Sequence, residues 1–369
     1  MLPPRIGTLT SGARDAITDV TGVTVGHATL SDGDVQTGVT VVRPHAGDAY
    51  LNRVPAGVAV INGFGKSVGL VQVEELGVLE TPIALTNTFS VPAVASAQIR
   101  QCVASHPECG RGLPTVNPLV FECNDGYLND IQRMAVREAD YLGAWSSANE
   151  EVAQGAVGAG RGMSCFGLKG GIGTASRVVA VPDDLRITVG ALVLANFGVL
   201  QNLVLSGQPV GRQLAVQLKA QTPARSNASG RLQGAEFGPE KGSIIVLIAT
   251  DAPLNARQLR RLAVRAGVGI ARTGSVFGHG SGDIALAFST AYTVPLSPEE
   301  PMPALAMLHD ARLDTLFQAV ADSVEQAIVH ALWHAEPLVG RDGHTRAALR
   351  EMLGTGTADG GIAASPNIN

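Results

Sequence analysis

The chain has 369 residues, 45% of them hydrophobic and 16% charged, so it can bury the core of one large α/β domain. Its formal net charge of −5 argues against nucleic acid or an anionic membrane surface as the main partner. The four cysteines form no CxxC pair, so we expect buried free thiols rather than a disulfide framework.

The N-terminal sequence and the hydropathy pattern bear on localisation. The first residues, Met-Leu-Pro-Pro-Arg-Ile-Gly, lack the basic and apolar regions of a signal peptide. No run reaches the ~18–20 apolar residues that span a membrane. We therefore expect a cytoplasmic protein with no membrane partner.

The first part of the chain alternates strand-like and helix-like segments. Short runs rich in β-branched residues predict strands at 23–25, 37–42, 58–61, 83–85 and 117–122. Apolar residues at helical spacing predict helices at 67–79, 94–103 and 131–143. Lys66-Ser67 looks like the end of a phosphate loop, but Val60 stands where that loop requires glycine, so we reject a nucleotide site.

The second part begins with a glycine-rich stretch at 155–173, which we interpret as a hairpin-rich loop. Strands at 177–181 and 187–195 follow, and residues 205–242 form a polar stretch that predicts an exposed linker. A buried strand from Ser243, a helix at 255–271, a strand at 284–289 and a long helix at 312–335 complete the pattern. We expect the tail from Gly354 to be disordered.

The Gly242-Ser243 junction lies between the predicted linker and five large aliphatic residues. A serine hydroxyl needs a nearby base, and cleavage before Ser243 would create one, because an α-amine has a reference pKa of about 7.7–8.0. Gly242 suits such a cut because it adopts strained dihedral angles. Taken alone, this stretch is better explained by a serine that merely begins a strand, because Gly-Ser before an apolar run is common.

Other polar residues flank predicted strand ends. Ser281 and Asp283 alternate with glycines before a buried strand, where they could orient a nucleophile or simply form a turn. Glu122 could bind a substrate ammonium group, and Tyr127 and Asn196 could donate to an oxyanion. Taken alone, each of these three residues is better explained by an ordinary structural role.

The histidines offer no clear metal site or general base. His279 is interpreted as a hydrogen-bonding loop residue, since an N-terminal serine supplies its own amine. His330 and His334 have ligand spacing on one helix, but no glutamate follows His330 as an HExxH motif would require. We expect no metal and no cofactor.

Four segments taken together are more specific than any one of these patterns. Residues 124–130 (NDGYLND), 158–174 (GAGRGMSCFGLKGGIGT), 242–254 (GSIIVLIATDAPL) and 278–283 (GHGSGD) resemble, in this order, the L-aminopeptidase/D-esterase family, which includes the β-peptidyl aminopeptidases. The resemblance spans roughly residues 22–332.

The resemblance implies a single αββα sandwich over residues 1–369, like that of ornithine acetyltransferase. It implies a precursor that cleaves itself into chains 1–242 and 243–369, which assemble as oligomers of the two-chain unit. It further implies Ser243 as nucleophile with its own amine as base, oriented by Ser281 and Asp283, with Tyr127 and Asn196 at the oxyanion and Glu122 at the substrate amine.

The expected function is therefore a self-processing aminopeptidase or amidase acting on short peptides, amino-acid amides or esters through an acyl-enzyme. The alternatives are an acyltransferase on the same fold and an unprocessed small-molecule binding protein. The sequence does not distinguish a preference for L-, D- or β-amino acids.

Overall fold

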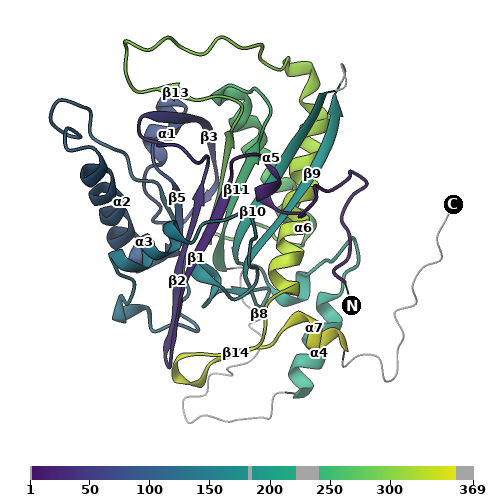
Figure 1. Ribbon diagram of the computed structural model, residues 1–369. Helices are drawn as coiled ribbons and strands as arrows, with labels where there is room; N and C mark the ends of the chain where they lie inside the picture. Colours follow the sequence, from purple (N-terminus) through teal and green to yellow (C-terminus); the bar gives the residue numbers. More distant parts are fainter. Residues whose placement is uncertain (1, 182–184, 222–240, 355–369) are drawn as a thin grey trace.

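The computed structural model describes residues 2–181, 185–221 and 241–354 (Figure 1). Most of its strands belong to two sheets. The four-stranded sheet has the order β1-β2-β5-β6. Its strands are β1 (Thr24–Asp32), β2 (Val35–Arg43), β5 (Ile83–Asn87) and β6 (Val120–Cys123).

The seven-stranded sheet has the order β13-β3-β12-β11-β10-β9, and β4 pairs with β3 beside this path. Its strands are β3 (Asn52–Gly63), β4 (Val78–Leu79), β9 (Gly171–Val181), β10 (Leu185–Asn196), β11 (Lys241–Thr250), β12 (Gly280–Ser289) and β13 (Val294–Pro295). The neighbours β11 and β12 run parallel, whereas β10 and β11 run antiparallel. β11 therefore lies inside the sheet, with a partner on each edge.

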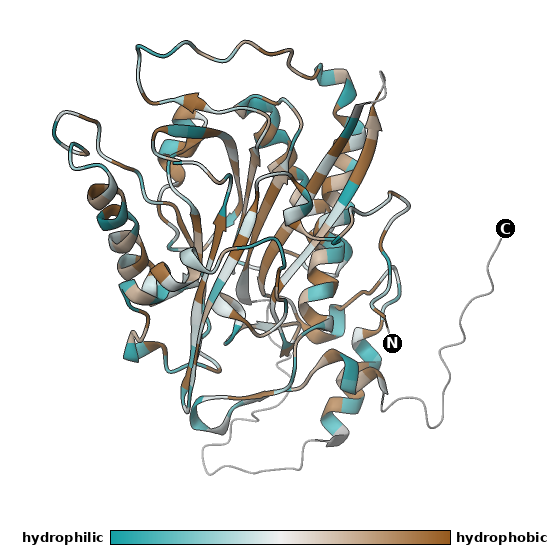
Figure 2. Cartoon of the chain, in the orientation of Figure 1, coloured by the Kyte–Doolittle hydropathy of each residue, from teal (hydrophilic) through white to brown (hydrophobic). Residues whose placement is uncertain are grey.

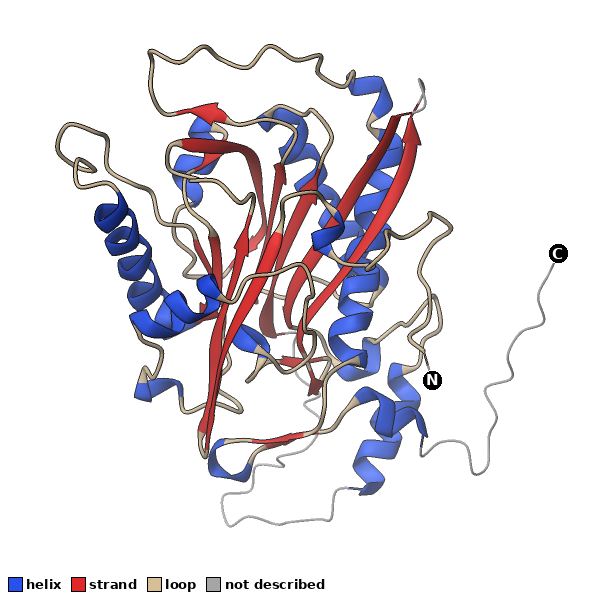
Figure 3. Cartoon of the chain, viewed as in Figure 1, coloured by secondary structure: helices blue, strands red, loops and turns tan. Residues whose placement is uncertain are grey.

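The described helices are α1 (Leu70–Leu76), α2 (Val91–Ser105), α3 (Glu138–Ser146), α4 (Gly211–Gln221), α5 (Ala256–Arg272), α6 (Asp314–Trp333) and α7 (Leu349–Gly354). α2 and α3 cover the outer face of the smaller sheet, and α5 and α6 cover that of the larger sheet, where Figure 3 shows the long helix. Two small hairpins pair β7 (Ser164–Cys165) with β8 (Leu168–Lys169), and β14 (Leu338–Val339) with β15 (Thr345–Arg346).

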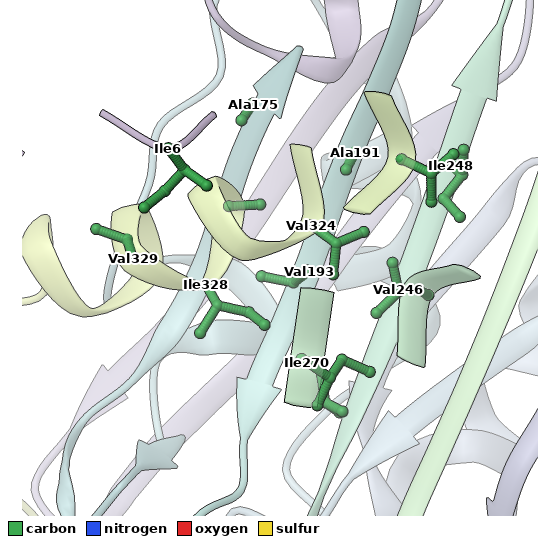
Figure 4. Packing of buried hydrophobic residues seen from close by; sticks show 14 of the residues in the cluster. Ile6, Ala175, Ala191, Val193, Val246, Ile248, Ile270, Val324, Ile328 and Val329 are labelled. Atoms are coloured by element: carbon green, nitrogen blue, oxygen red, sulfur yellow. The ribbon is translucent and has the colours of Figure 1, made fainter. Parts of the chain in front are cut away.

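Three buried clusters hold these layers together. One lies between the sheets and includes Phe121 of β6 and Leu247 of β11. A second joins the four-stranded sheet to α2 and α3. The third joins the larger sheet to α5 and α6, where Val246 and Val193 meet Ile270 and Val324 (Figure 4). The order of layers is helix, sheet, sheet, helix, so the predicted αββα sandwich is confirmed.

The sequence pattern explains why β11 occupies the centre. Its aliphatic side chains alternate between two apolar clusters, with Ile244, Val246 and Ile248 toward the helices and Ile245 and Leu247 toward the other sheet. A strand buried on both faces requires such a continuous apolar run. Figure 2 shows hydrophobic colour along the strands of both sheets.

Several element boundaries differ from the sequence predictions. The helix predicted at 67–79 is limited to α1, because Gly77 takes a left-handed conformation that ends it. The helix predicted at 131–143 is a short 3-10 turn followed by α3, because Met134 also has a positive φ of 43°. The long helix predicted at 312–335 is confirmed as α6.

The prediction of a linker at 205–242 is wrong at both ends of this range, which are the parts that the structure describes. Gly211–Gln221 form helix α4, whose Leu214 and Ala215 are buried against the main core. β11 begins at Lys241, so Gly242 already belongs to the strand. Residues 222–240 lie outside the described residues, as does the tail predicted to be disordered from Gly354, except Gly354 itself, which ends α7.

Candidate active site

Ser243 lies near the start of β11, between strands from two other parts of the chain. It pairs with Asn196 of β10 on one edge and with Gly282 of β12 on the other. The Gly282 N–H donates a hydrogen bond of 3.1 Å to Ser243 Oγ. Ser243 is only 5% exposed, so main-chain pairing and one backbone donor fix the position of its hydroxyl.

Gly242 has a backbone conformation that other residues rarely adopt. Its φ is +111°, and a Cβ atom added there would lie 2.0 Å from the carbonyl oxygen of Asn196. A side chain at this position would force β10 and β11 apart. The peptide bond before Ser243 therefore depends on glycine.

Ser281 and Asp283 are fully buried on β12, and Ser281 Oγ donates a 2.6 Å hydrogen bond to Asp283 Oδ1. Ser281 pairs with Gly242. Because side chains alternate along a strand, Ser281 and Asp283 lie on the helix-covered side with Ala285, whereas Ser243 faces the other sheet with Ile245. The serine–aspartate pair thus flanks the peptide bond before Ser243 rather than its hydroxyl.

Sequence reasoning missed two residues that shape this part of the site. Gly282 supplies the N–H to Ser243 Oγ, but a glycine between Ser281 and Asp283 has no side chain to draw attention. Asn62 on β3 donates through Nδ2 to the carbonyl oxygens of Gly278 and Ser281. It thereby fixes the turn that leads into β12.

Glu122 lies on β6 of the other sheet and is 3% exposed. Its carboxylate accepts a 2.8 Å hydrogen bond from the Lys66 N–H and another from Thr88 Oγ1. The next residue, Cys123, places its thiol 3.4 Å from the Ser243 carbonyl oxygen. Burial raises the pKa of the Cys123 thiol well above its usual value, which keeps it a neutral donor. The end of β6 therefore contacts β11 at the serine.

Asn196 connects the end of β10 to two loops. Its Oδ1 accepts a 2.8 Å hydrogen bond from the Ser164 N–H, and its Nδ2 donates at 3.0 Å to the Asn124 carbonyl oxygen. The side-chain amide nitrogen of Asn196 carries two N–H groups, and only one of them is needed for the bond to Asn124. The other N–H group could donate a hydrogen bond to an oxyanion. The contact with Asn124 ties the loop that carries Tyr127 to the strand edge beside Ser243.

Tyr127 is 38% exposed, and its ring contacts two side chains near the end of the described chain. His344 stacks on it at 4.6 Å between ring centroids, and the Arg346 guanidinium carbon lies 3.5 Å from the ring centroid. Asp125 in the same loop is buried, and this burial raises the pKa of its carboxyl group to about 7.

The histidines considered from the sequence lie elsewhere. His279 is exposed, 6.1 Å from Phe64 between ring centroids. His330 is buried, and its Nδ1 donates to the Thr174 carbonyl oxygen at 2.7 Å while burial lowers its pKa. Among residues 2–181, 185–221 and 241–354, no group of three His, Cys, Asp or Glu side chains is arranged to hold a metal ion.

Solved structures define the class to which this fold belongs. The chain matches an L-aminopeptidase/D-Ala-esterase/amidase from Ochrobactrum anthropi, described as a prototype for the serine aminopeptidases and a variant of the Ntn hydrolase fold. The two share 36% identity and a TM-score of 0.83, over 95% of each chain. The class is therefore that of hydrolases with an N-terminal-nucleophile fold.

The family model for peptidase family S58 matches residues 15–346, and the chain belongs to this family. It is 40% identical to a β-peptidyl aminopeptidase of Sphingosinicella microcystinivorans, over 93% of this chain and 88% of that protein. It is 45% identical to the PH0078 protein of Pyrococcus horikoshii OT3, with a TM-score of 0.85 over 95% and 96% of the two chains.

These similarities confirm the predicted enzyme class, a hydrolase of the aminopeptidase type that acts on peptide substrates. They favour hydrolysis over both alternatives considered from the sequence. No helix within the described ranges is long and apolar enough to cross a membrane.

Proposed function

We propose that the chain cleaves itself between Gly242 and Ser243 and then releases N-terminal residues from short peptides, amides or esters. The observation that carries this proposal is the setting of one peptide bond. A glycine with a φ of +111° precedes a serine whose Oγ accepts a backbone hydrogen bond, and a buried serine–aspartate pair lies beside that bond.

The self-cleavage step would transfer the Gly242 acyl group from nitrogen to oxygen. Ser243 Oγ forms a bond to the Gly242 carbonyl carbon, the C–N bond breaks, and the hydroxyl proton ends on the released nitrogen. Water then hydrolyses the ester and leaves a Gly242 carboxylate and a free Ser243 hydroxyl. The chain would become two chains, 1–242 and 243–369, within a single domain.

Substrate turnover would use the same oxygen. The α-amine of Ser243 takes the hydroxyl proton as Oγ attacks the substrate carbonyl, and burial favours the neutral amine that this requires. Ser281 pairs with Gly242, the residue next to this nitrogen, so the Ser281–Asp283 pair would orient the amine. Water then releases the amino acid from the acyl-enzyme.

The remaining roles concern charge on the substrate. Asn196 and Tyr127 would donate to the oxyanion, supported by the pairing of Asn196 with Ser243. Glu122 would bind the ammonium group, supported by its burial and by the contact of neighbouring Cys123 with Ser243. A substrate ammonium group would supply the positive charge that a buried carboxylate favours.

The names of relatives suggest the substrate range. Two are β-peptidyl aminopeptidases and another is an L-aminopeptidase with D-Ala-esterase/amidase activity. We propose that this enzyme likewise accepts short amides of α- or β-amino acids, as a cytoplasmic oligomer of processed units. A panel of L-, D- and β-amino-acid p-nitroanilides measures the preference, and size-exclusion chromatography with light scattering measures the assembly.

Denaturing mass spectrometry tests the central claim. The purified protein should give two fragments that meet between Gly242 and Ser243, and Ser243→Ala should remain one inactive chain. Ser146→Ala changes an exposed serine on α3 and should process like the unaltered enzyme. An intact 38.0 kDa chain without amidase activity would overturn the proposal. Cleavage of Ser243→Ala at the same bond would assign the cut to another protease.

A further inference from the structure

The segment 338–347, which we call the C-terminal strap, comprises β14, a turn and β15, and lies against the Tyr127 loop at 124–130. Arg341 donates from its backbone N–H to the Leu128 carbonyl oxygen at 2.8 Å and from Nε to that of Gly126 at 2.7 Å. His344 Nδ1 donates to the Tyr127 carbonyl oxygen at 2.8 Å. Three successive carbonyl groups of the loop are thus bonded to the strap.

Arg346, in the strap, contacts Tyr127, one of the two proposed oxyanion donors, and also contacts the residue that holds the other, Asn196. The Arg346 guanidinium lies over the Tyr127 ring, 3.5 Å from its centroid. Arg346 Nε also donates a 3.0 Å hydrogen bond to Ser164 Oγ. The Ser164 N–H in turn donates to Asn196 Oδ1. Arg346 therefore reaches Tyr127 directly and Asn196 through one intervening residue.

The strap is itself anchored on the far side of Arg346. The Lys169 N–H donates a 2.9 Å hydrogen bond to the Ala347 carbonyl oxygen. The Lys169 ammonium group is buried and donates to the carbonyl oxygens of Gly160, Met163 and Gly170. The glycine-rich segment that carries Ser164 and the strap that carries Arg346 are thus joined at two neighbouring positions.

From these contacts we propose that Arg346 is a positioning residue that sets the Tyr127 hydroxyl and the Asn196 amide in one fixed arrangement. The inference rests on the oxyanion roles proposed above for these two residues. Arg346 lies after the proposed cut and Tyr127 before it, so the second chain would adjust a catalytic group of the first.

Arginine suits this task better than lysine. A planar guanidinium can stack on an aromatic ring and donate from Nε within its own plane at the same time. A lysine ammonium group is a compact charge that can do one or the other, but lacks the fixed geometry that joins the two contacts. The proposal therefore predicts that keeping the charge alone does not restore full activity.

The test compares Arg346→Met and Arg346→Lys with Arg350→Met, which alters an exposed arginine on α7. Mass spectrometry first gives the processed fraction, and kcat is expressed per processed unit. We expect Arg346→Met to lower kcat about 10- to 100-fold and to leave KM within about twofold of its original value. A small misplacement of a donor reduces the stabilisation of the transition state more than it reduces the binding of the substrate. Arg346→Lys should recover part of this loss, and Arg350→Met should match the unaltered enzyme.

A double-mutant cycle with Tyr127→Phe separates positioning from general support of the fold. If Arg346 acts through the Tyr127 hydroxyl, Tyr127→Phe with Arg346→Met loses less than the product of the two single losses. The inference would be overturned if the loss in the double variant equals the product of the two single losses, or if Arg346→Met leaves kcat unchanged. If Arg346→Met does not fold, as judged by circular dichroism, the same cycle is run with Arg346→Lys. An active, cleaved Ser243→Ala would instead refute the proposed function.

Discussion

The two halves of the candidate site are built by different means. Ser243, Ser281 and Asp283 lie on the adjacent strands β11 and β12, whose register fixes their relative positions. We call this group the strand half. Tyr127 and Asn196, the donor half, depend on contacts of their own side chains: His344 and Arg346 lie against the Tyr127 ring, and the Ser164 N–H donates to Asn196 Oδ1. The nucleophile is thus held by strand register, whereas the Tyr127 ring is held by side chains that mutagenesis can alter one at a time.

The largest effect is expected in the strand half. Asp283→Asn keeps an oxygen that can accept the hydrogen bond from Ser281 but removes the negative charge beside the proposed amine. We expect kcat to fall about 10³-fold, within the range for losing a group that supports proton transfer. Steady-state assays on the processed fraction measure this. A loss below about tenfold would mean that the buried carboxylate serves the fold rather than the reaction.

A smaller loss is expected when a donor is removed. Asn196→Ala deletes the amide that pairs with the Ser164 N–H and the Asn124 carbonyl oxygen. We expect kcat to fall about 10²-fold, the usual cost of one oxyanion donor. Asn149→Ala, which removes an exposed amide elsewhere, serves as the control. If KM rises while kcat stays constant, Asn196 acts in substrate binding instead.

The loop that carries Tyr127 should also make stability depend on pH, through Asp125. Burial raises the pKa of this carboxyl group from 3.8 to about 7 in the folded protein, so the folded state binds more protons than the unfolded state between these values. Stability should therefore fall as pH rises, by about 2 kcal/mol from pH 5 to pH 7 for this group alone.

Asp125→Asn, which cannot titrate, provides the comparison for this effect. The unfolding free energy from urea titrations should fall less between pH 5 and pH 7 in the variant than in the unaltered protein. Equal falls in both proteins would show that the Asp125 carboxyl group is ionised throughout. Its hydrogen bonds from Thr37 Oγ1 and Asn129 Nδ2 would then be the reason.

The smallest effect is expected at Ser164. Ser164→Ala removes the hydroxyl that accepts from Arg346 Nε but keeps the N–H that donates to Asn196. We expect kcat to fall only about 3- to 10-fold, equivalent to roughly one hydrogen bond. Assays beside Ser146→Ala measure the difference. A loss as large as that of Asn196→Ala would mean that the Arg346–Ser164 hydrogen bond is needed to hold the Asn196 amide, rather than contributing a single replaceable contact.

The same contrast explains what the sequence could predict. Gly242-Ser243 before an apolar run, and Ser281 and Asp283 two positions apart, are local patterns, and the structure brings them together on paired strands. The resemblance implied the αββα order, whereas length and composition indicated only one large α/β domain. The proposed catalytic roles of Ser243, Ser281 and Asp283 remain predictions.

The contacts that hold the donor half carry no comparable local signal. His344 lies 217 residues from Tyr127, and only the folded chain brings the two rings together. The polar composition of 205–242 predicts a linker, yet part of it forms helix α4, whose Leu214 and Ala215 pack against the core. Long-range packing of this kind is not encoded by composition or by periodicity.

The position of β11 has a consequence for how the enzyme would denature. β3, β9 and β10 precede the proposed cut, whereas β12 and nearly all of β11 follow it, yet all five belong to one sheet. Folding would thus be a first-order process that is completed before the bond breaks. After cleavage, recovery from complete unfolding would require two chains to find each other, so its rate would depend on concentration. The mature enzyme would then owe its lifetime to a high unfolding barrier rather than to reversible refolding.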